Sequence, residues 1–143
     1  MSAPKRVLFL CIGNACRSQM AEAFARAYGS DVMAPSSAGF APAQRVPEAT
    51  IRAMAEKNLD VRSQAPKSIS ELGGAHFDLI INMSGYPLPQ LNGTPLREWD
   101  VPDPIVMDYE EHCRVRDRIE MLVMRLILEL RREQKKNSQN SGL

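Results

Sequence analysis

The chain has 143 residues, of which 44% are hydrophobic and 24% charged, as expected for one globular domain with a single core. Eighteen basic and seventeen acidic residues leave a net charge of +1, so the composition favours neither nucleic acid nor a membrane as a partner. The longest early apolar run, residues 7–12, is too short for a secretory signal or a membrane span, and a cytoplasmic location is expected. Three cysteines in a chain of this size do not suggest a disulfide framework.

Strand and helix signals alternate along the first half of the chain. Residues 6–10 are an apolar run that leads into a glycine-containing loop, as in a strand buried on both faces of a parallel sheet. Apolar side chains then recur at three- and four-residue spacing over residues 20–28, and Gly29 follows, which predicts a helix and its end. Residues 32–40 are predicted to form a second strand. Pro47 opens a predicted second helix over residues 48–57.

The second half continues the alternation. Ser68 and Glu71 form a capping-box pattern for a short helix. Residues 77–82 and 96–99 are predicted as the third and fourth strands, and an amphipathic stripe over residues 109–132 predicts a long helix that packs on the sheet. The polar residues 133–143 are expected to be a frayed or disordered tail behind a catalytic domain of residues 1–132.

This order predicts a single α/β domain with a four-stranded, parallel, twisted sheet flanked by helices. Ligands of such sheets bind beyond the carboxyl ends of the strands, and Cys11 stands at the end of the first one. The loop after this strand is therefore the predicted phosphate-binding loop.

The predicted loop combines a nucleophile, flexible backbone and a cation. Backbone amides and the first turn of the following helix can hold a tetrahedral anion, Arg17 can grip two of its oxygens, and the same field would favour the thiolate of Cys11. Ser18 could donate a hydrogen bond to that thiolate, and Asn14 tolerates a left-handed conformation. The predicted substrate-binding residues are Ile12, Gly13, Asn14, Ala15, Cys16, Arg17 and Ser18. A Cys-x5-Arg pattern also arises by chance, but the strand before it and the helix after it favour the functional interpretation.

In these residues the chain resembles the low-molecular-weight protein tyrosine phosphatase superfamily, which includes thiol-coupled arsenate reductases. The resemblance rests on residues 11–18, the following Met20-Ala21-Glu22, the segment Ser37-Ala38-Gly39 and the pair Asp103-Pro104, in family order. Gln19 after Ser18, the segment from Trp99 to Pro104, and residues 115–119 look more like the arsenate-reductase branch, since Pro usually follows the Ser in the phosphatases.

The resemblance implies that Asp103 is the second catalytic group, beside Cys11 and Arg17. Cleavage of a phosphate ester needs a proton for the leaving oxygen, and release of a phosphocysteine needs a base for water, so one carboxyl group can serve both steps. On sequence alone Asp100 and Asp108 remain close alternatives.

No cofactor or metal site is predicted. His76 and His112 have no partner at metal-ligand spacing and are interpreted as structural residues. The methionines and Trp99 are interpreted as core or pocket-wall residues.

Two departures from the family pattern bear on function. Thioredoxin-coupled arsenate reductases carry two further cysteines after the third strand, whereas residues 82–86 of this chain contain none and Cys113 lies in the predicted C-terminal helix. The phosphatases place aromatic residues directly after the Asp-Pro pair, where this chain has Ile105 and Val106; Tyr109 and Tyr86 are possible substitutes.

Three functions are therefore expected, in this order. The first is a cysteine-dependent phosphatase that forms a phosphocysteine and acts on a phosphorylated small molecule or protein, including phosphotyrosine. The second is an arsenate reductase or arsenate-thiol transferase that uses an external thiol or redoxin. The third is a phosphate-binding module without turnover.

Cys11 and Cys16 are also predicted to form a protective disulfide after oxidation.

Overall fold

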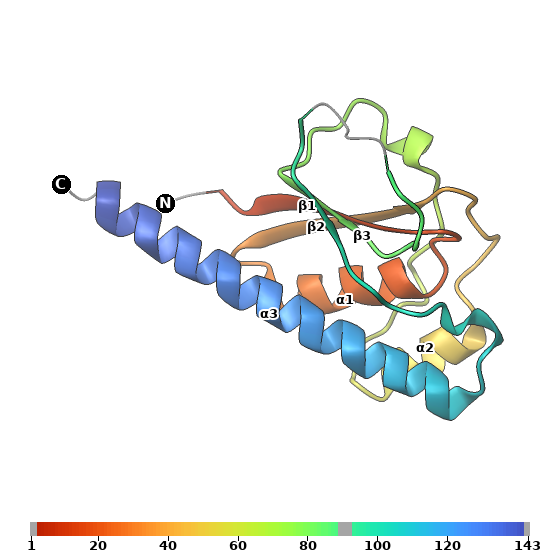
Figure 1. Cartoon of the computed structure of the whole chain (residues 1–143). Coiled ribbons are helices and arrows are strands. Elements are labelled where there is room, and N and C mark those ends of the chain that lie inside the picture. Colours follow the sequence, from red (N-terminus) through yellow and green to blue (C-terminus); the bar gives the residue numbers. More distant parts are fainter. Residues whose placement is uncertain (1–2, 89–92, 142–143) are drawn as a thin grey trace.

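The computed structural model of the chain describes residues 3–88 and 93–141 (Figure 1). Its strands are β1 (Lys5–Cys11), β2 (Met33–Gly39), β3 (Leu79–Asn82) and β4 (Leu96–Glu98), and they form one parallel sheet in the order β2-β1-β3-β4. The predicted α/β fold with a four-stranded parallel sheet is confirmed. The strand order reverses next to β1, where sheets of this kind form their ligand crevice.

The three α-helices lie together on one face of the sheet (Figure 1). They are α1 (Arg17–Gly29), α2 (Glu48–Ala55) and α3 (Tyr109–Ser141), and two short 3-10 helices, η1 (Ile69–Leu72) and η2 (Pro104–Val106), interrupt the loops. The element bounds differ from the predicted ones by a few residues at most, apart from the end of α3.

The continuous apolar run of β1 follows from burial on both sides. Val7, Phe9 and Cys11 point into the large core beneath the helices, whereas Leu8 and Leu10 point into a smaller core on the opposite face. That smaller core is covered by the segment around η1 instead of by a long helix. Because both sets of side chains are buried, β1 is anchored from two sides and holds Cys11 at a fixed place.

The long helix α3 packs closely on α1. Gly29, the last residue of α1, lies so near Ile127 that a Cβ at position 29 would stand 2.6 Å from Ile127 Cγ1. The stop signal predicted from Gly29 therefore also marks a place where the two helices lie too close together for a side chain at position 29.

The expected frayed tail is wrong for residues 133–141, because α3 continues without interruption to Ser141, and residues 142–143 lie outside the described part. Its apolar stripe ends near Leu130, but Glu133, Gln134, Lys135 and Lys136 are good helix formers, and no Gly or Pro breaks the helix before Ser141. The last turns extend past the sheet on the side where β1 begins (Figure 1). Among the described residues, no helix combines the length and apolarity that crossing a membrane requires.

Candidate active site

A pocket of about 150 Å³ opens where β1 ends and α1 begins. It contains all three residues to which the sequence analysis assigned catalysis. Its walls are formed by Cys11, Ile12, Gly13, Ala15, Cys16, Arg17, Ala43, Asp103 and Ile105. Of the predicted loop residues, Asn14 and Ser18 stand behind this wall and are completely buried.

Two main-chain carbonyl groups of the loop bind the segment that follows β2. The carbonyl oxygens of Ile12 and Gly13 accept hydrogen bonds from Ala41 N (2.9 Å) and Ala43 N (2.9 Å) in the segment after β2. Because the N–H of a trans peptide points opposite to its carbonyl, the N–H groups of Gly13 and Asn14 point away from that segment. Successive backbone N–H groups of this kind can form an anion-binding concavity.

The shape of the loop depends on the backbone conformation of Asn14 and on the absence of a side chain at Gly39. Asn14 has φ 49°, the left-handed conformation that the sequence analysis expected asparagine to tolerate. Gly39, at the end of β2, lies against the loop so closely that a Cβ there would be 2.6 Å from Ile12 O and 2.8 Å from Asn14 N. Only glycine fits at position 39.

Ser18 contacts Cys11, the predicted nucleophile. Its Oγ lies 2.9 Å from Cys11 Sγ, and it accepts a hydrogen bond of 2.7 Å from Asn14 Nδ2. Since the amide supplies one proton to Ser18 Oγ, the serine hydroxyl is free to donate its own proton to sulfur.

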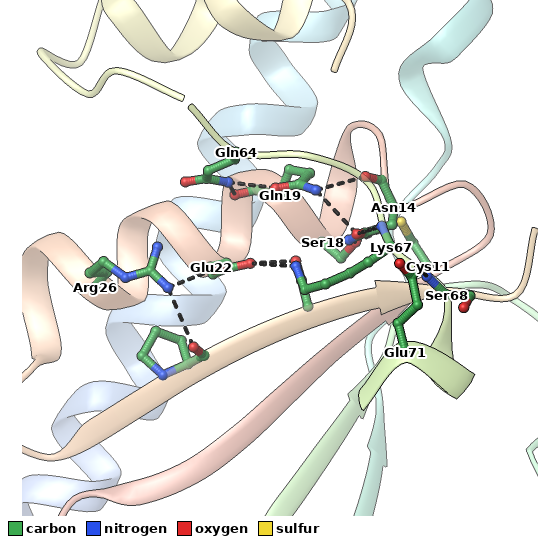
Figure 2. A network of polar contacts seen from close by, with 12 residues as sticks. Cys11, Asn14, Ser18, Gln19, Glu22, Arg26, Gln64, Lys67, Ser68 and Glu71 are labelled. Carbon is green, nitrogen blue, oxygen red and sulfur yellow. Dashed lines mark hydrogen bonds and ion pairs between the residues drawn. The ribbon is translucent and has the colours of Figure 1, made fainter. Parts of the chain in front are cut away.

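Asn14 is the centre of a wider polar network that sequence reasoning missed (Figure 2). Gln19 donates to both the backbone and side-chain oxygens of Asn14, at 2.9 and 3.1 Å, and the backbone N–H of Lys67 donates to the same side-chain oxygen at 2.9 Å. Gln64 in turn donates to Gln19 Oε1 at 2.6 Å. These hydrogen bonds attach the loop to the segment of Gln64 and Lys67, about fifty positions later in the chain. No pattern of spacing in the sequence predicts them.

Arg17 is buried and held by main-chain carbonyl groups. Its Nη1 donates to Met83 O at 2.5 Å and to Val101 O at 3.0 Å, while Nη2 lies 3.6 Å from a carboxylate oxygen of Asp103. With Nη1 occupied, the edge formed by Nε and Nη2 is the one that can grip two oxygens of a bound anion.

The three acidic candidates have different environments. Asp103 lines the pocket, and its Oδ1 accepts a hydrogen bond of 3.1 Å from Ile105 N. Asp108 caps α3 by accepting from Glu111 N at 2.9 Å, and Asp100 is an exposed residue whose carbonyl oxygen binds Arg118. Of these carboxyl groups, only Asp103 stands within the pocket beside Cys11 and Arg17.

With this geometry in place, the comparison with known families is decisive. The family described as "Low molecular weight phosphotyrosine protein phosphatase" matches residues 6–136, which is most of the chain.

The chain belongs to this family.

Members named as arsenate reductases are among its relatives. The chain is 34% identical over 129 residues to an arsenate reductase of Bacillus cereus strain 03BB102, covering 87% of this chain and 96% of the relative. It is 30% identical over 130 residues to a "Glutaredoxin arsenate reductase" of Synechocystis sp., covering 88% and 98%. A solved structure entitled "An arsenate reductase in the phosphate binding state" superposes with a TM-score of 0.79 at 28% identity, covering 88% and 98%. The family member described here is thus an enzyme of the phosphatase and arsenate-reductase superfamily, and its resemblance to the arsenate-reductase branch is confirmed.

Cys11, Cys16 and Cys113 are all free thiols, but their surroundings differ. Cys16 is buried, and this burial raises its pKa to about 11, although a hydrogen bond with Thr50 acts in the opposite direction. Cys113 lies on the first turns of α3, with its sulfur 3.9 Å from Glu56 Oε2 and outside the pocket wall. Cys16 is thus held as a thiol at neutral pH.

The two histidines of this family member occupy contrasting places. His76 is exposed and lies 3.3 Å from Asp78. His112 is buried, and its Nε2 lies 2.9 Å from Thr50 Oγ1, behind the wall of the pocket. Within residues 3–88 and 93–141, no three His, Cys, Asp or Glu side chains are placed to hold a metal ion.

Sequence reasoning missed the carbonyl groups of Met83 and Val101 that orient Arg17, and the pair Thr50 and His112. Every residue has a main-chain carbonyl group, so the amino-acid sequence does not indicate which of these groups will bind Arg17. For His112, a polar side chain on the apolar stripe of a predicted helix was the available signal.

Proposed function

We propose that this enzyme reduces arsenate, with Cys11 as nucleophile and an external thiol as reductant. The observation that carries the proposal is the pocket that holds Cys11, Arg17 and Asp103 in a chain whose relatives are named arsenate reductases. Arsenate and phosphate are both tetrahedral oxyanions, so the amide concavity and the Nε–Nη2 edge of Arg17 suit either ion. This places the second of the expected functions ahead of the first.

The first step is attack by Cys11 on arsenic. The sulfur forms an S–As bond, and one arsenate oxygen leaves as water after taking a proton from Asp103. Arg17 and the loop amides stabilise the charge on the remaining oxygens. Ser18, whose Oγ lies 2.9 Å from the sulfur, can donate a hydrogen bond to it.

The second step needs a thiol from outside the chain. An external thiolate attacks Cys11 Sγ and forms a mixed disulfide, while the electron pair of the S–As bond passes to arsenic, which leaves as arsenite. A second external thiol then releases Cys11 by thiol-disulfide exchange. Two thiols are oxidised to one disulfide as arsenic passes from the +5 to the +3 state.

The positions of the three cysteines support an external donor. The loop after β3 contains no cysteine between Asn82 and Pro87, Cys113 stands outside the pocket, and Cys16 is a buried thiol with a raised pKa. We propose glutathione, together with a glutaredoxin, as the donor, since one relative is named a glutaredoxin arsenate reductase. Such a donor implies a reducing compartment, which supports a cytoplasmic location.

A phosphomonoesterase activity is the second candidate, and a hollow next to the pocket favours it. Phe40 and Tyr86, together with Pro87 and Leu88, line a space of about 260 Å³ that shares Ile12 with the pocket. Both rings are exposed, so they offer an apolar wall to the organic group of a phosphate ester. Ile105 and Val106, which stand where the phosphatases carry aromatic residues, are both exposed, and Ile105 lines the pocket.

One set of assays tests these candidates. Purified protein is incubated with arsenate and glutathione, with or without glutaredoxin, and in parallel with arsenate and thioredoxin or with an aryl phosphate. We expect arsenite formation with glutathione, faster with glutaredoxin, and none in the Cys11→Ser variant. Cys113→Ser is the matched control and should keep full activity. Aryl phosphate cleavage without arsenite formation would favour the phosphatase, and phosphate binding without either turnover would favour a pure binding module.

A further inference from the structure

The hydrogen bonds around Asn14 have fixed directions, because its side-chain amide and that of Gln19 each meet a main-chain group (Figure 2). The N–H of Lys67 can only donate, so the Asn14 atom that lies 2.9 Å from it is the amide oxygen. The main-chain carbonyl group of Asn14 can only accept, so the Gln19 atom that lies 2.9 Å from it is the amide nitrogen. These two contacts determine which way each amide group faces.

Gln64 binds the other end of the Gln19 side chain. Its Nε2 donates to the main-chain oxygen of Gln19 at 3.2 Å and to Gln19 Oε1 at 2.6 Å. Gln19 is completely buried, so its Oε1 needs a donor inside the protein, and Gln64 supplies one. With its oxygen turned toward Gln64, Gln19 presents its nitrogen to both oxygens of Asn14.

The nitrogen of the Asn14 amide faces the reactive end of the loop. The oxygen of this amide is bonded to Lys67 and Gln19. Its Nδ2 therefore donates to Ser18 Oγ at 2.7 Å, and this Oγ lies 2.9 Å from Cys11 Sγ. The hydrogen bonds thus run in one direction through the network, toward the hydroxyl group next to the sulfur.

Asn14 needs such support because of its backbone conformation. Its φ of 49° lies in the left-handed region, which costs free energy for a residue that has a side chain. The residue is completely buried and stands between Gly13 and Ala15 in the loop whose N–H groups can bind an anion. Gln19 bonds both its main chain and its side chain, so these two contacts oppose relaxation of the loop.

We propose that Gln19 is a positioning residue, oriented by Gln64, that holds Asn14 in the conformation that the anion-binding loop requires. Gln19 stands behind the pocket wall, so it acts through Asn14 and not by contact with the anion. This role rests on the proposed function, in which the loop binds arsenate or phosphate.

Titration with inorganic phosphate tests the proposal. Gln19→Met keeps the approximate length of the side chain but removes its amide group. We expect it to weaken phosphate binding roughly 10-fold, the order expected when buried polar groups lose a hydrogen-bond partner. Gln64→Met, which leaves Gln19 without its donor, should weaken binding by a smaller factor. Gln139→Met, the same change at an exposed position of α3, is the matched control and should have no effect.

The double variant asks whether Gln64 acts through Gln19. If it does, Gln19→Met combined with Gln64→Met binds phosphate no more weakly than Gln19→Met alone. Losses that multiply would overturn the role given to Gln64, and unchanged binding in Gln19→Met would overturn the role of Gln19. If the unmodified protein binds no phosphate, the proposed function fails instead.

Amide hydrogen exchange tests the role of Gln19 without any anion. The N–H of Lys67 donates to Asn14, whereas the N–H of Gly39 donates to the main-chain oxygen of Lys67 at 2.9 Å and does not involve Asn14. We expect Gln19→Met to accelerate exchange at Lys67 and to leave exchange at Gly39 unchanged.

Two outcomes of the exchange experiment would overturn the proposal. Unchanged exchange at Lys67 would show that Gln19 does not hold Asn14. Equal acceleration at Lys67 and Gly39 would show that the whole segment loosens, which is a structural effect without any specific positioning of Asn14. Should Gln19→Met fail to fold, Gln64→Met is measured at the same two amides, with the same expectation and the same two contradicting results.

Discussion

Arg17 uses one end of its guanidinium for structure and presents the other to the pocket. Its Nη1 donates hydrogen bonds to the main-chain carbonyl oxygens of Met83 and Val101, which fix its position. A lysine at this position has one ammonium group and cannot satisfy both carbonyl groups while also gripping two oxygens of an anion.

Arg17→Lys should therefore weaken phosphate binding and lower arsenate turnover about 10²- to 10³-fold, the usual effect of removing one oriented hydrogen-bond donor from such a site. Isothermal titration with phosphate and steady-state kinetics measure the two effects. Arg114→Lys, an exposed change on α3, is the matched control and should behave like the unmodified enzyme. Unchanged binding in Arg17→Lys would remove this residue from the site.

Cys16 carries a prediction from its raised pKa. At pH 7 a thiol whose pKa is about 11 is almost entirely protonated, so it attacks an oxidised Cys11 slowly, and the rate should rise about tenfold per pH unit below pH 11. Mild peroxide should produce a Cys11–Cys16 disulfide that dithiothreitol reverses, and more completely at pH 9 than at pH 7.

Peptide mass mapping measures this linkage, and Cys16→Ala is the direct control. In that variant, the same treatment should convert more Cys11 into sulfinic and sulfonic acids, which dithiothreitol cannot reduce. Equal recovery of activity in both proteins would show that Cys16 does not protect Cys11.

Among the elements, those with a local pattern were predictable from the sequence. The apolar run of β1 and the spacing of apolar residues in α1 and α3 reflect burial on particular faces, which residue identity records directly. The left-handed Asn14 and the contact from Ser18 to Cys11 were also predictable, because they depend on residues within one short loop.

The parts that could not be predicted depend on contacts between distant segments. The Gln64 and Lys67 links to the loop, and the hydrogen bond between Thr50 and His112, join residues that only the folded chain brings together. The helical end of α3 was missed for a different reason: the apolar stripe stops near Leu130, but intrinsic helix propensity continues.

The close contact between α1 and α3 predicts the effect of a substitution at Gly29. A methyl group at Gly29 would stand 2.6 Å from Ile127 Cγ1, and the branched side chain of Ile127 is buried and stiff. Gly29→Ala should therefore lower the free energy of unfolding by about 1–3 kcal/mol, although alanine is the better helix former.

Urea unfolding measures this change. Gly74→Ala is the matched control, because a Cβ at Gly74 meets no atom within 4 Å, and its free energy of unfolding should change by no more than about 0.5 kcal/mol. A Gly29→Ala protein as stable as the unmodified one would show that α3 moves away from α1 without cost.

For the molecule as a whole, His112 links stability to pH. Burial lowers the pKa of His112 below its ordinary value of 6.5; nearby Arg116 acts in the same direction, while the bond to Pro104 and the charge of Asp103 oppose it. The unfolded chain therefore binds this proton first as the pH falls. The stability that the neutral ring contributes is complete above pH 6.5 and is lost progressively below it.

The free energy of unfolding should consequently fall in the pH window below 6.5, by at most about 1.4 kcal/mol per pH unit from this group. His112→Phe should flatten the curve in that window, whereas His76→Phe should not. Identical curves for His112→Phe and the unmodified protein would show that His112 does not link folding to protons.

The fold brings Cys11, the predicted nucleophile, together with the buried guanidinium of Arg17 and the carboxyl group of Asp103 at the carboxyl edge of its sheet. Cys16 lines the same pocket as a buried thiol, and Cys113 lies outside the pocket wall. The central claim is that Cys11 attacks arsenate and that an external thiol completes the reduction. A single-turnover experiment with reduced protein, arsenate and glutathione, without glutaredoxin and followed by intact and peptide mass spectrometry, tests it most directly. The account predicts glutathione attached to Cys11, formed together with arsenite and only when arsenate is present. Arsenite formation in the Cys11→Ser variant, or in the unmodified protein without any added thiol, would contradict it.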